Sequence, residues 1–410
     1  MGGHEVSIPH SRGRHDYRSA RLSFWRGSFE DAAFAARRAL KRGDARGRLI
    51  LAKEALSRCR YEDALTHCEA LIVDRILLRD AASLYWTAAK ATKRVPIMRR
   101  VCEIIPPGLA SGAAARTYVA MIDKGIAELC SANGVKAELA FLPNRPLPVV
   151  EGRAGAGVLV RTLRLMLDTG AETLCLSRAA AASLGLTTVT GHRGLFAGGR
   201  RARVEGAMLA ELRLGTAEFS NVPVAVLSHL PQLTPEDPID GIIGADILKA
   251  GNAVWDFAAG CLRLAPGRAT VAADGVRLPA RVLGAHIIVV RATLSHRIDG
   301  WFFLDSGGTF GVAPDAAAWK LMVSGSDIRA DVGTGGGGAV HFELATGDLF
   351  EIAGMQFRDF TLVGGIFPER LKQRVGVDIR GIVSHAILSQ FARLTIDFRE
   401  PSVYFEAAKT

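Results

Sequence analysis

The sequence predicts a multidomain protein, with an all-α part over residues 1–142 and an all-β part of two lobes over residues 143–266 and 267–410. Length is the first reason, because 410 residues are more than one domain usually holds. Periodicity is the second, since apolar residues recur every three or four positions in the first part and form short runs afterwards. Charge is the third: residues 1–150 hold 25 Lys and Arg against 15 Asp and Glu, whereas residues 151–410 hold 26 of each.

The first part contains two similar segments of helical period. Residues 27–40 (GSFEDAAFAARRAL) and 59–71 (CRYEDALTHCEAL) share an aromatic residue followed by Glu, Asp and Ala, and Phe29 and Tyr61 are 32 positions apart. The repeat resembles the tetratricopeptide family, in which small alanines let paired helices pack closely around an aromatic residue. Residues 79–95 are predicted as a third, degenerate copy. An ordinary Ala-rich helical bundle is the alternative.

The surplus of positive charge in the first part favours an acidic protein partner, because a cationic surface attracts one. A solvated face without a partner is the alternative. We expect the later part of the chain to fold and act without these helices. The opposing view is that the helices shield an apolar face of the first lobe.

Residues 143–157 (PNRPLPVVEGRAGAG) end the helical pattern with three prolines and three glycines. Short strand-like runs follow, separated by Gly, Pro and Asp. Two of these runs end in the same way, as LMLDTGAETLCLS at residues 165–177 and FFLDSGGTFGVAP at residues 302–314. Asp168 and Asp305 are therefore 137 positions apart, each followed by a small hydroxyl residue and Gly.

Three further features repeat in the same order after each aspartate. They are glycine-rich segments around Gly198 and Gly335, the apolar segments DGIIGADIL (240–248) and RGIVSHAIL (380–388), and strands that close with Asp256-Phe257 and Asp397-Phe398. The offsets from each aspartate to Gly244 and Ser384 are 76 and 79 residues. Four features at near-equal offsets indicate an internal duplication.

Together these residues resemble the retropepsin-like aspartic proteases of the pepsin and retropepsin superfamily. The resemblance covers residues 150–410 and implies two tandem units that form a bilobal acid-protease domain with the active cleft between the lobes. The first unit matches the family pattern closely. The second departs from it at Ser384, where the apolar-apolar-Gly segment of the family has Gly.

The resemblance implies that Asp168 and Asp305 form the catalytic pair. Two carboxylates about 3 Å apart hold one proton between them, so that one activates water and the other acts as the acid. The residues implied to support the pair are Thr169, Gly170, Ser306, Gly307, Gly241, Gly244, Gly381 and Ser384. Those implied to form flaps over a bound peptide are Phe196, Gly198, Gly199, Gly335 and Gly336. The alternatives are turn-forming aspartates and plain glycine loops.

We therefore predict a bacterial-type aspartic endopeptidase that cleaves a protein or peptide as a monomer, without a metal or other cofactor, while the helical repeats recruit a partner or the substrate. A catalytically weak protease-like adaptor that holds peptides is the alternative, which Ser384 keeps open. The sequence contains no phosphate loop, nucleic-acid module, zinc-ligand spacing or apolar run long enough for a membrane span. Unpatterned cysteines and no visible signal peptide favour the cytoplasm, and a misassigned start would leave the periplasm open.

Overall fold

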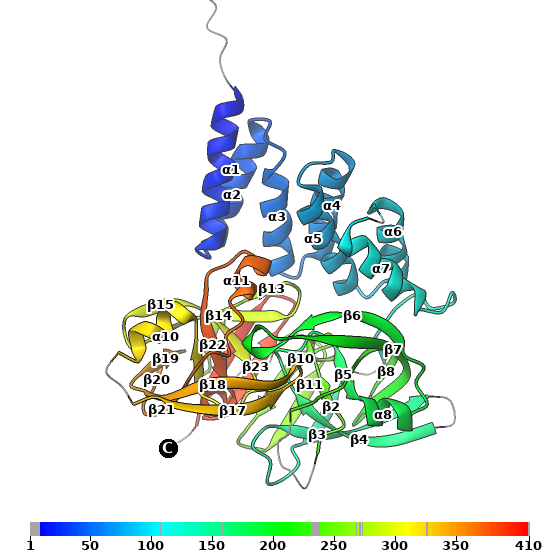
Figure 1. Ribbon diagram of the computed structural model, residues 1–410, viewed down its shortest axis with the longest axis vertical. Coiled ribbons are helices and arrows are strands. Elements are labelled where there is room, and N and C mark those ends of the chain that lie inside the picture. Colours follow the sequence, from blue (N-terminus) through cyan, green and yellow to red (C-terminus); the bar gives the residue numbers. More distant parts are fainter. Residues whose placement is uncertain are drawn as a thin grey trace, which may run out of the picture.

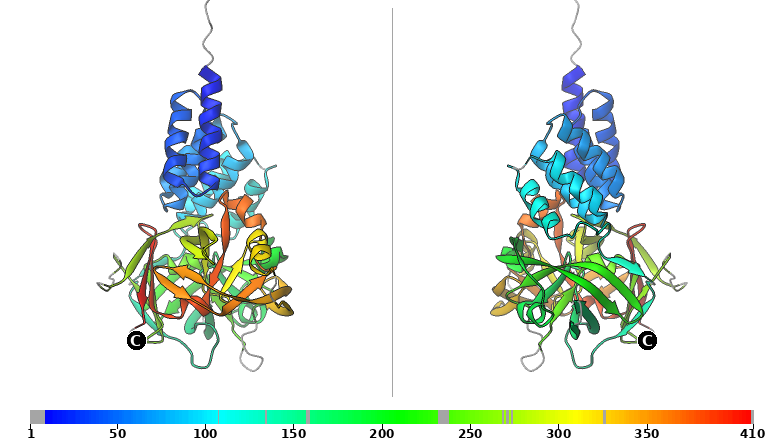
Figure 2. Two further views of the ribbon diagram at one scale, coloured as in Figure 1. Left: turned by 90° about the vertical axis from the view of Figure 1, so that its left-hand side faces the viewer. Right: turned by 90° about the vertical axis from the view of Figure 1, so that its right-hand side faces the viewer.

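The computed structural model describes residues 9–106, 108–133, 135–156, 159–231, 238–267, 269, 272, 274–324 and 327–408. Helices come first in the chain, and they stack on one end of a β-rich body (Figures 1 and 2). They are α1 (Pro9–Trp25), α2 (Phe29–Lys41), α3 (Gly47–Ser57), α4 (Tyr61–Val73), α5 (Leu78–Ala91), α6 (Val95–Ile104) and α7 (Ala110–Ala120). In the part of the chain that is described, no helix is long and apolar enough to cross a membrane.

The two similar helical segments begin corresponding helices. Phe29 is the first residue of α2 and Tyr61 the first residue of α4. Alanines make up most of the buried side of α2, which lets the neighbouring helices approach closely. Residues 79–95 are predicted as a third, degenerate copy of the repeat, but most of them lie in α5, which packs against α4.

The helical part ends at Ala120 rather than at residue 142. Beyond it lie the strands β1 (Ser131–Asn133) and β2 (Ala137–Ala140). β1 pairs with β8 (Ala217–Leu227) and β2 with β11 (Cys261–Ala265), both antiparallel. Ala137 and Leu139 are buried while their neighbours are exposed, which is the alternation of a strand with one covered face. The predicted domain boundary therefore cuts through segments that belong to the β-rich body.

Six strands of the first lobe close into a barrel. The sheet order is β1-β8-β5-β9-β4-β3-β7-β6, and an additional β7–β8 pairing joins β7 back to β8. The elements are β3 (Val149–Ala156), β4 (Leu159–Leu167), β5 (Leu174–Ser177), α8 (Arg178–Ser183), β6 (Val189–Leu195), the short 3-10 helix Ala197–Gly199, β7 (Arg201–Leu214), β9 (Gly241–Ile243) and α9 (Ala245–Leu248).

The second lobe is built on a ten-stranded sheet of order β17-β18-β21-β16-β22-β15-β14-β19-β20, with β13 paired to β14. Its strands are β13 (Arg281–Leu283), β14 (Ile287–Leu294), β15 (Ile298–Asp305), β16 (Val312–Pro314), β17 (Arg329–Gly335), β18 (Gly338–Gly347), β19 (Phe350–Ile352), β20 (Met355–Phe357), β21 (Phe360–Gly364) and β22 (Ile379–Ser384). Its helices are α10 (Ala316–Met322), α11 (Arg370–Val375) and α12 (His385–Leu388).

A six-stranded sheet of order β12-β24-β23-β10-β11-β2 joins the lobes. It combines β10 (Asn252–Asp256) and β11 with β12 (Val276–Pro279), β23 (Phe391–Asp397) and β24 (Ser402–Ala407). The antiparallel pair β10–β23 forms the seam, because β10 follows the first lobe in the chain and β23 follows the second. Trp255 on β10 is fully buried in the core that this sheet shares with both lobes.

The first helices share a hydrophobic core with the second lobe. Phe24 and Phe29 are buried together with Val289, Trp301 and Phe303. The Trp301 ring meets the Phe29 ring edge-on at 5.3 Å, and its Nε1 donates a hydrogen bond to the Gly27 carbonyl at 3.2 Å.

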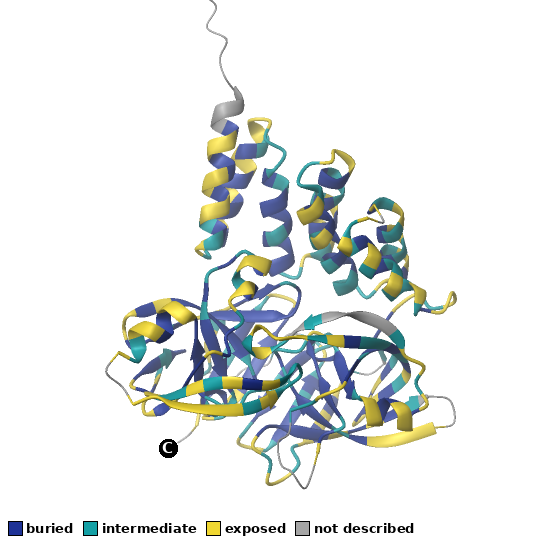
Figure 3. Ribbon diagram, in the orientation of Figure 1, coloured by how far each residue is buried: buried dark blue, intermediate teal, exposed yellow. Residues whose placement is uncertain are grey.

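These contacts argue against the expectation that the β-rich part folds without the helices. The helices cover an apolar face, but that face lies mainly on the second lobe and not on the first. The free surface of α1 and α2 lies on their outer sides, where exposed residues gather (Figure 3).

Candidate active site

Each predicted aspartate lies at the end of a strand that has a parallel neighbour. β4 leads into Asp168 and pairs in parallel with β9, which begins with Gly241. β15 ends at Asp305 and pairs in parallel with β22, with Asp305 opposite Ser384. The apolar segments that repeat in the sequence are therefore the strands beside the two aspartate motifs.

Thr169 and Ser306 tie the two motifs together through reciprocal hydrogen bonds. The Ser306 amide donates to Thr169 Oγ1 at 3.0 Å, and the Thr169 amide donates to Ser306 Oγ at 3.1 Å. Each hydroxyl donates in turn to a carbonyl of the opposite strand: Thr169 Oγ1 to Leu304 at 2.7 Å and Ser306 Oγ to Leu167 at 2.9 Å. Both side chains are 1% exposed, so these four bonds form away from solvent and fix the two loops against each other.

The Asp168 and Asp305 carboxyl groups lie next to each other at this junction, close enough for each to shift the pKa of the other. The Gly170 amide donates to Asp168 Oδ1 at 2.7 Å, and the Gly307 amide donates to Asp305 Oδ1 at 2.9 Å. A Cβ on Gly170 would lie 3.1 Å from Asp305 Cγ, and one on Gly307 would lie 2.5 Å from Asp168 Cγ. Each glycine therefore leaves space for the aspartate of the other lobe.

The surroundings raise the pKa of both carboxyl groups. Burial raises the pKa of Asp168 well above its usual range, and the neighbouring charge of Asp305 raises it further, against the opposing effect of the Gly170 amide. Burial also raises the pKa of Asp305, which the Gly307 amide opposes. Both residues keep partial contact with solvent. The pair can thus hold a proton at a pH where an isolated aspartate has lost it.

Ser384 fits its position because Gly308, which has no side chain, leaves room for its hydroxyl. Its Oγ lies 2.6 Å from the Asp305 carbonyl oxygen and 2.8 Å from that of Gly308. A Cβ on Gly308 would lie only 2.5 Å from that hydroxyl. In the first lobe the corresponding positions carry Ala171 and Gly244, and a Cβ on Gly244 would lie 2.6 Å from the Thr173 carbonyl oxygen. The first lobe thus combines Ala171 with Gly244, and the second combines Gly308 with Ser384.

The two predicted support glycines within the parallel strands are also tightly enclosed. A Cβ on Gly381 would lie 2.9 Å from the Ala313 carbonyl oxygen, and one on Gly241 would run into the Cys175 carbonyl oxygen. Both glycines therefore allow close packing of strands beneath the aspartate loops.

The two predicted flap segments are turns of hairpins that touch each other. Phe196, Gly198 and Gly199 lie between β6 and β7, and Gly335 and Gly336 lie at the β17–β18 turn. A Cβ on Gly336 would lie 2.6 Å from the Phe196 ring. The Gly198 amide donates to the Ile366 carbonyl oxygen at 2.8 Å, and Arg200 Nε donates to that of Gly337 at 3.3 Å. The hairpin of each lobe thus rests on the other lobe.

Sequence reasoning missed a polar network directly behind the Asp168 loop. Asp246 Oδ2 lies 2.5 Å from Thr173 Oγ1, and the Asp246 amide donates to the Glu172 carbonyl oxygen at 3.2 Å. Lys90 and Lys93 from the helical part reach this network. Glu172 stands in the motif itself and was visible, but no sequence signal indicates a partner 82 residues earlier.

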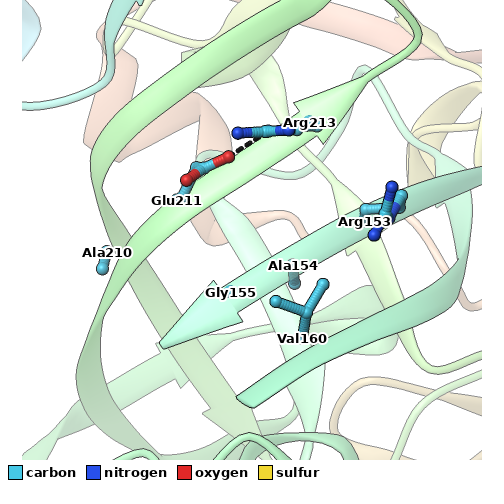
Figure 4. A pocket seen from close by; sticks show the side chains of 7 residues that line it. All are labelled: Arg153, Ala154, Gly155, Val160, Ala210, Glu211 and Arg213. Carbon is cyan, nitrogen blue, oxygen red and sulfur yellow. Dashed lines mark hydrogen bonds and ion pairs between the residues drawn. The ribbon is translucent and has the colours of Figure 1, made fainter. Parts of the chain in front are cut away.

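Two surface pockets lie apart from the aspartate pair. One of about 160 Å³ lies between β3, β4 and β7 (Figure 4). Its lining residues are Arg153, Ala154, Gly155, Val160, Ala210, Glu211 and Arg213. Another of about 610 Å³ lies beside the β17–β18 hairpin. Among the residues that the structure describes, no group of three or more His, Cys, Asp or Glu side chains could hold a metal ion.

Comparison with known protein families finds a match in the first lobe. Residues 150–247 match a family described as aspartyl protease. The matched segment contains the first lobe from β3 to α9, including Asp168 and Gly244. No curated protein matches the chain. This part of the chain is thus similar to aspartyl proteases.

Proposed function

We propose that the protein is an aspartic endopeptidase whose catalytic pair, Asp168 and Asp305, comes from one chain. The observation that carries the proposal is the reciprocal bonding of Thr169 and Ser306, beside which the two carboxyl groups lie next to each other. The match of residues 150–247 to aspartyl proteases supports it from the first lobe. The parallel pairs β4–β9 and β15–β22 support the view that the lobes are tandem retropepsin-like units.

In the proposed reaction, the pair shares one proton. One carboxyl group of the pair is protonated and donates its proton to the carbonyl oxygen of the scissile peptide. The other, ionised group accepts a proton from the attacking water, whose oxygen bonds to the carbonyl carbon. When the C–N bond breaks, the leaving nitrogen takes that proton, and a hydroxyl of the intermediate returns a proton to the first carboxyl group, which restores the pair. The Gly170 and Gly307 amides each hold Oδ1 of the aspartate two residues earlier throughout.

The touching hairpins give this site a cover. Phe196 packs against the same apolar cluster as Ala171, which follows the Asp168 motif. A peptide in the cleft would therefore lie beneath the Phe196 and Gly336 turns, where exclusion of water strengthens the interactions of the carboxyl groups. The hairpins must part to admit an extended chain.

The helical part is proposed to recruit a protein partner, with α2–α3 and α4–α5 as tetratricopeptide-like repeats. Much of its charge is used internally: Arg38 and Arg42 both pair with Asp16. Arg14, Arg18 and Arg21 are exposed on α1 at spacings of four and three residues, which places them along one side of the helix. Such a stripe favours an acidic partner, and added salt should weaken the contact.

The test is cleavage of an unfolded protein at acid and neutral pH by the wild type, Asp168→Asn and Asp305→Asn. Each substitution should abolish turnover while the melting temperature shows a folded protein. Asp299→Asn, on the same strand as Asp305 but exposed, is the matched control and should stay active. A mixture of the two inactive variants should remain inactive, and recovery would show a site formed between two chains. Peptide binding by a wild type that cleaves nothing would favour an adaptor.

A further inference from the structure

The C-terminal end of α5 reaches the loops beside Asp168 with two lysines. Lys90 lies in the last turn of α5, and its ammonium is 2.6 Å from Glu172 Oε1. Lys93 follows the helix, and its ammonium donates to the Asp246 carbonyl oxygen at 2.7 Å. One segment of the helical part therefore contacts both the loop that follows Asp168 and the helix α9 beneath it.

Glu172 and Asp246 belong to a single hydrogen-bonded unit with the Asp168 loop. The Asp168 amide donates to the Ile243 carbonyl oxygen at 3.1 Å, and the Ala245 amide donates to that of Ala171 at 2.9 Å. The bonds between Asp246 and residues 172 and 173 continue this contact. Each lysine contact is thus connected to Asp168 through a short, bonded path.

Glu172 is held in a cationic setting. Burial raises the pKa of Glu172, but the nearby Lys90, His286 and Arg374 outweigh this effect and hold the pKa below its usual range. About half of the Glu172 side-chain surface remains accessible. The Lys90 ammonium also lies 5.6 Å from the centre of the Trp86 ring, and that ring packs edge-on against Tyr118 at 5.5 Å. Packed aromatic rings therefore limit the positions open to Lys90.

The two aspartate loops differ in what fastens them. In the second lobe Ser384 fastens the Asp305 loop from inside, through its contacts with the Asp305 and Gly308 carbonyl oxygens. In the first lobe the corresponding residue is Gly244, which has no side chain to do this. The lysines reach the adjacent positions, at Glu172 and Asp246, from outside the lobe.

We propose that Lys90 and Lys93 are positioning residues through which the helical part holds the Asp168 loop in its working geometry. The inference rests on the proposed aspartic protease function. It makes the helical part a component of the catalytic unit in addition to any role in recruitment. A misplacement of about 1 Å in a catalytic group can lower a rate by roughly a hundredfold, so a loose Asp168 loop would lower turnover strongly.

The test uses the full chain with Lys90→Met, Lys93→Met and both together. Lys53→Met is the matched control, because Lys53 is also a lysine at the contact between the helices and the β-rich body, but it lies next to Gly376 of the second lobe. The double variant should lower kcat on a short peptide by roughly 10- to 100-fold with KM changed less than about threefold. Lys90→Arg should keep near-normal kcat, since it retains the ion pair.

Hydrogen exchange supplies a readout that does not depend on cleavage. In the double variant, amides of residues 168–176 should exchange faster, while those of residues 305–312 and the whole Lys53→Met protein should match the wild type. Unchanged exchange and unchanged kcat in the double variant would overturn the proposal, and so would equal loosening of both aspartate loops. A wild type without turnover contradicts the proposed function, whereas the exchange comparison still decides whether the lysines hold the loop.

Discussion

Thr169→Val should destabilise the fold strongly, although Val has nearly the shape of Thr. The hydroxyl accepts from the Ser306 amide and donates to the Leu304 carbonyl oxygen, and both bonds are buried. The variant leaves the Ser306 N–H without its acceptor, at a cost of about 1–3 kcal/mol, and removes a second bond worth about 1 kcal/mol. The expected loss in the free energy of unfolding is thus about 2–4 kcal/mol, a large share of the 5–15 kcal/mol typical of proteins.

Urea unfolding followed by tryptophan fluorescence measures this loss, and kcat measures its effect on the aspartate pair. Thr361→Val makes the same chemical change at an exposed position of β21 and should stay within about 0.5 kcal/mol of wild type. Thr169→Ser keeps the hydroxyl and should recover most of the stability. If Thr169→Val loses no more than Thr361→Val, the reciprocal bonds do not hold the lobes together and the reasoning fails.

Three further predictions concern the pair, the flaps and the helical contact. Asp168→Asn should be more stable than wild type at pH 7 and lose this advantage below about pH 4. A carboxyl group whose pKa is raised in the folded protein destabilises the fold once the pH rises above the pKa that the group has in the unfolded chain. Melting curves from pH 3 to 7 check this. Gly336→Val should lower kcat/KM through collision with Phe196 while stability changes little, and Thr334→Val on the same hairpin should have no comparable effect. Trp301→Ala should cost about 3–5 kcal/mol and expose the helical part to limited proteolysis, and an unchanged digestion pattern would contradict the shared core.

The aspartate site could be predicted well from the sequence because its determinants are local. An apolar strand, an acid, a hydroxyl residue and Gly follow one another directly, and the chain carries this order twice. The structure brings Asp168 and Asp305 together, as expected from the doubled motif. The turns at Phe196 and Gly336 touch each other, and their role as flaps stays a prediction.

The contacts between the helices and the lobes could not be predicted in the same way. Trp301 lies in an apolar run that predicts a buried strand whichever element packs on it. The sequence therefore does not indicate that this element is α2. A long lysine side chain such as Lys90 has no periodic signal, because most lysines on helices face solvent. The strands of residues 131–140 were missed because three or four residues are too few to show a clear alternation.

The sheet that joins the lobes cannot close until β23 and β24, which follow Asp305 in the chain, have been made. They supply inner strands of this sheet, and one edge of β10 stays unpaired until β23 is present. Asp256, fully buried in the finished protein, likewise lacks its bond from Arg393 Nε until then. Both aspartates are therefore synthesised well before the sheet that joins the two lobes is complete. The aspartate pair forms only after β23 and β24 have joined this sheet.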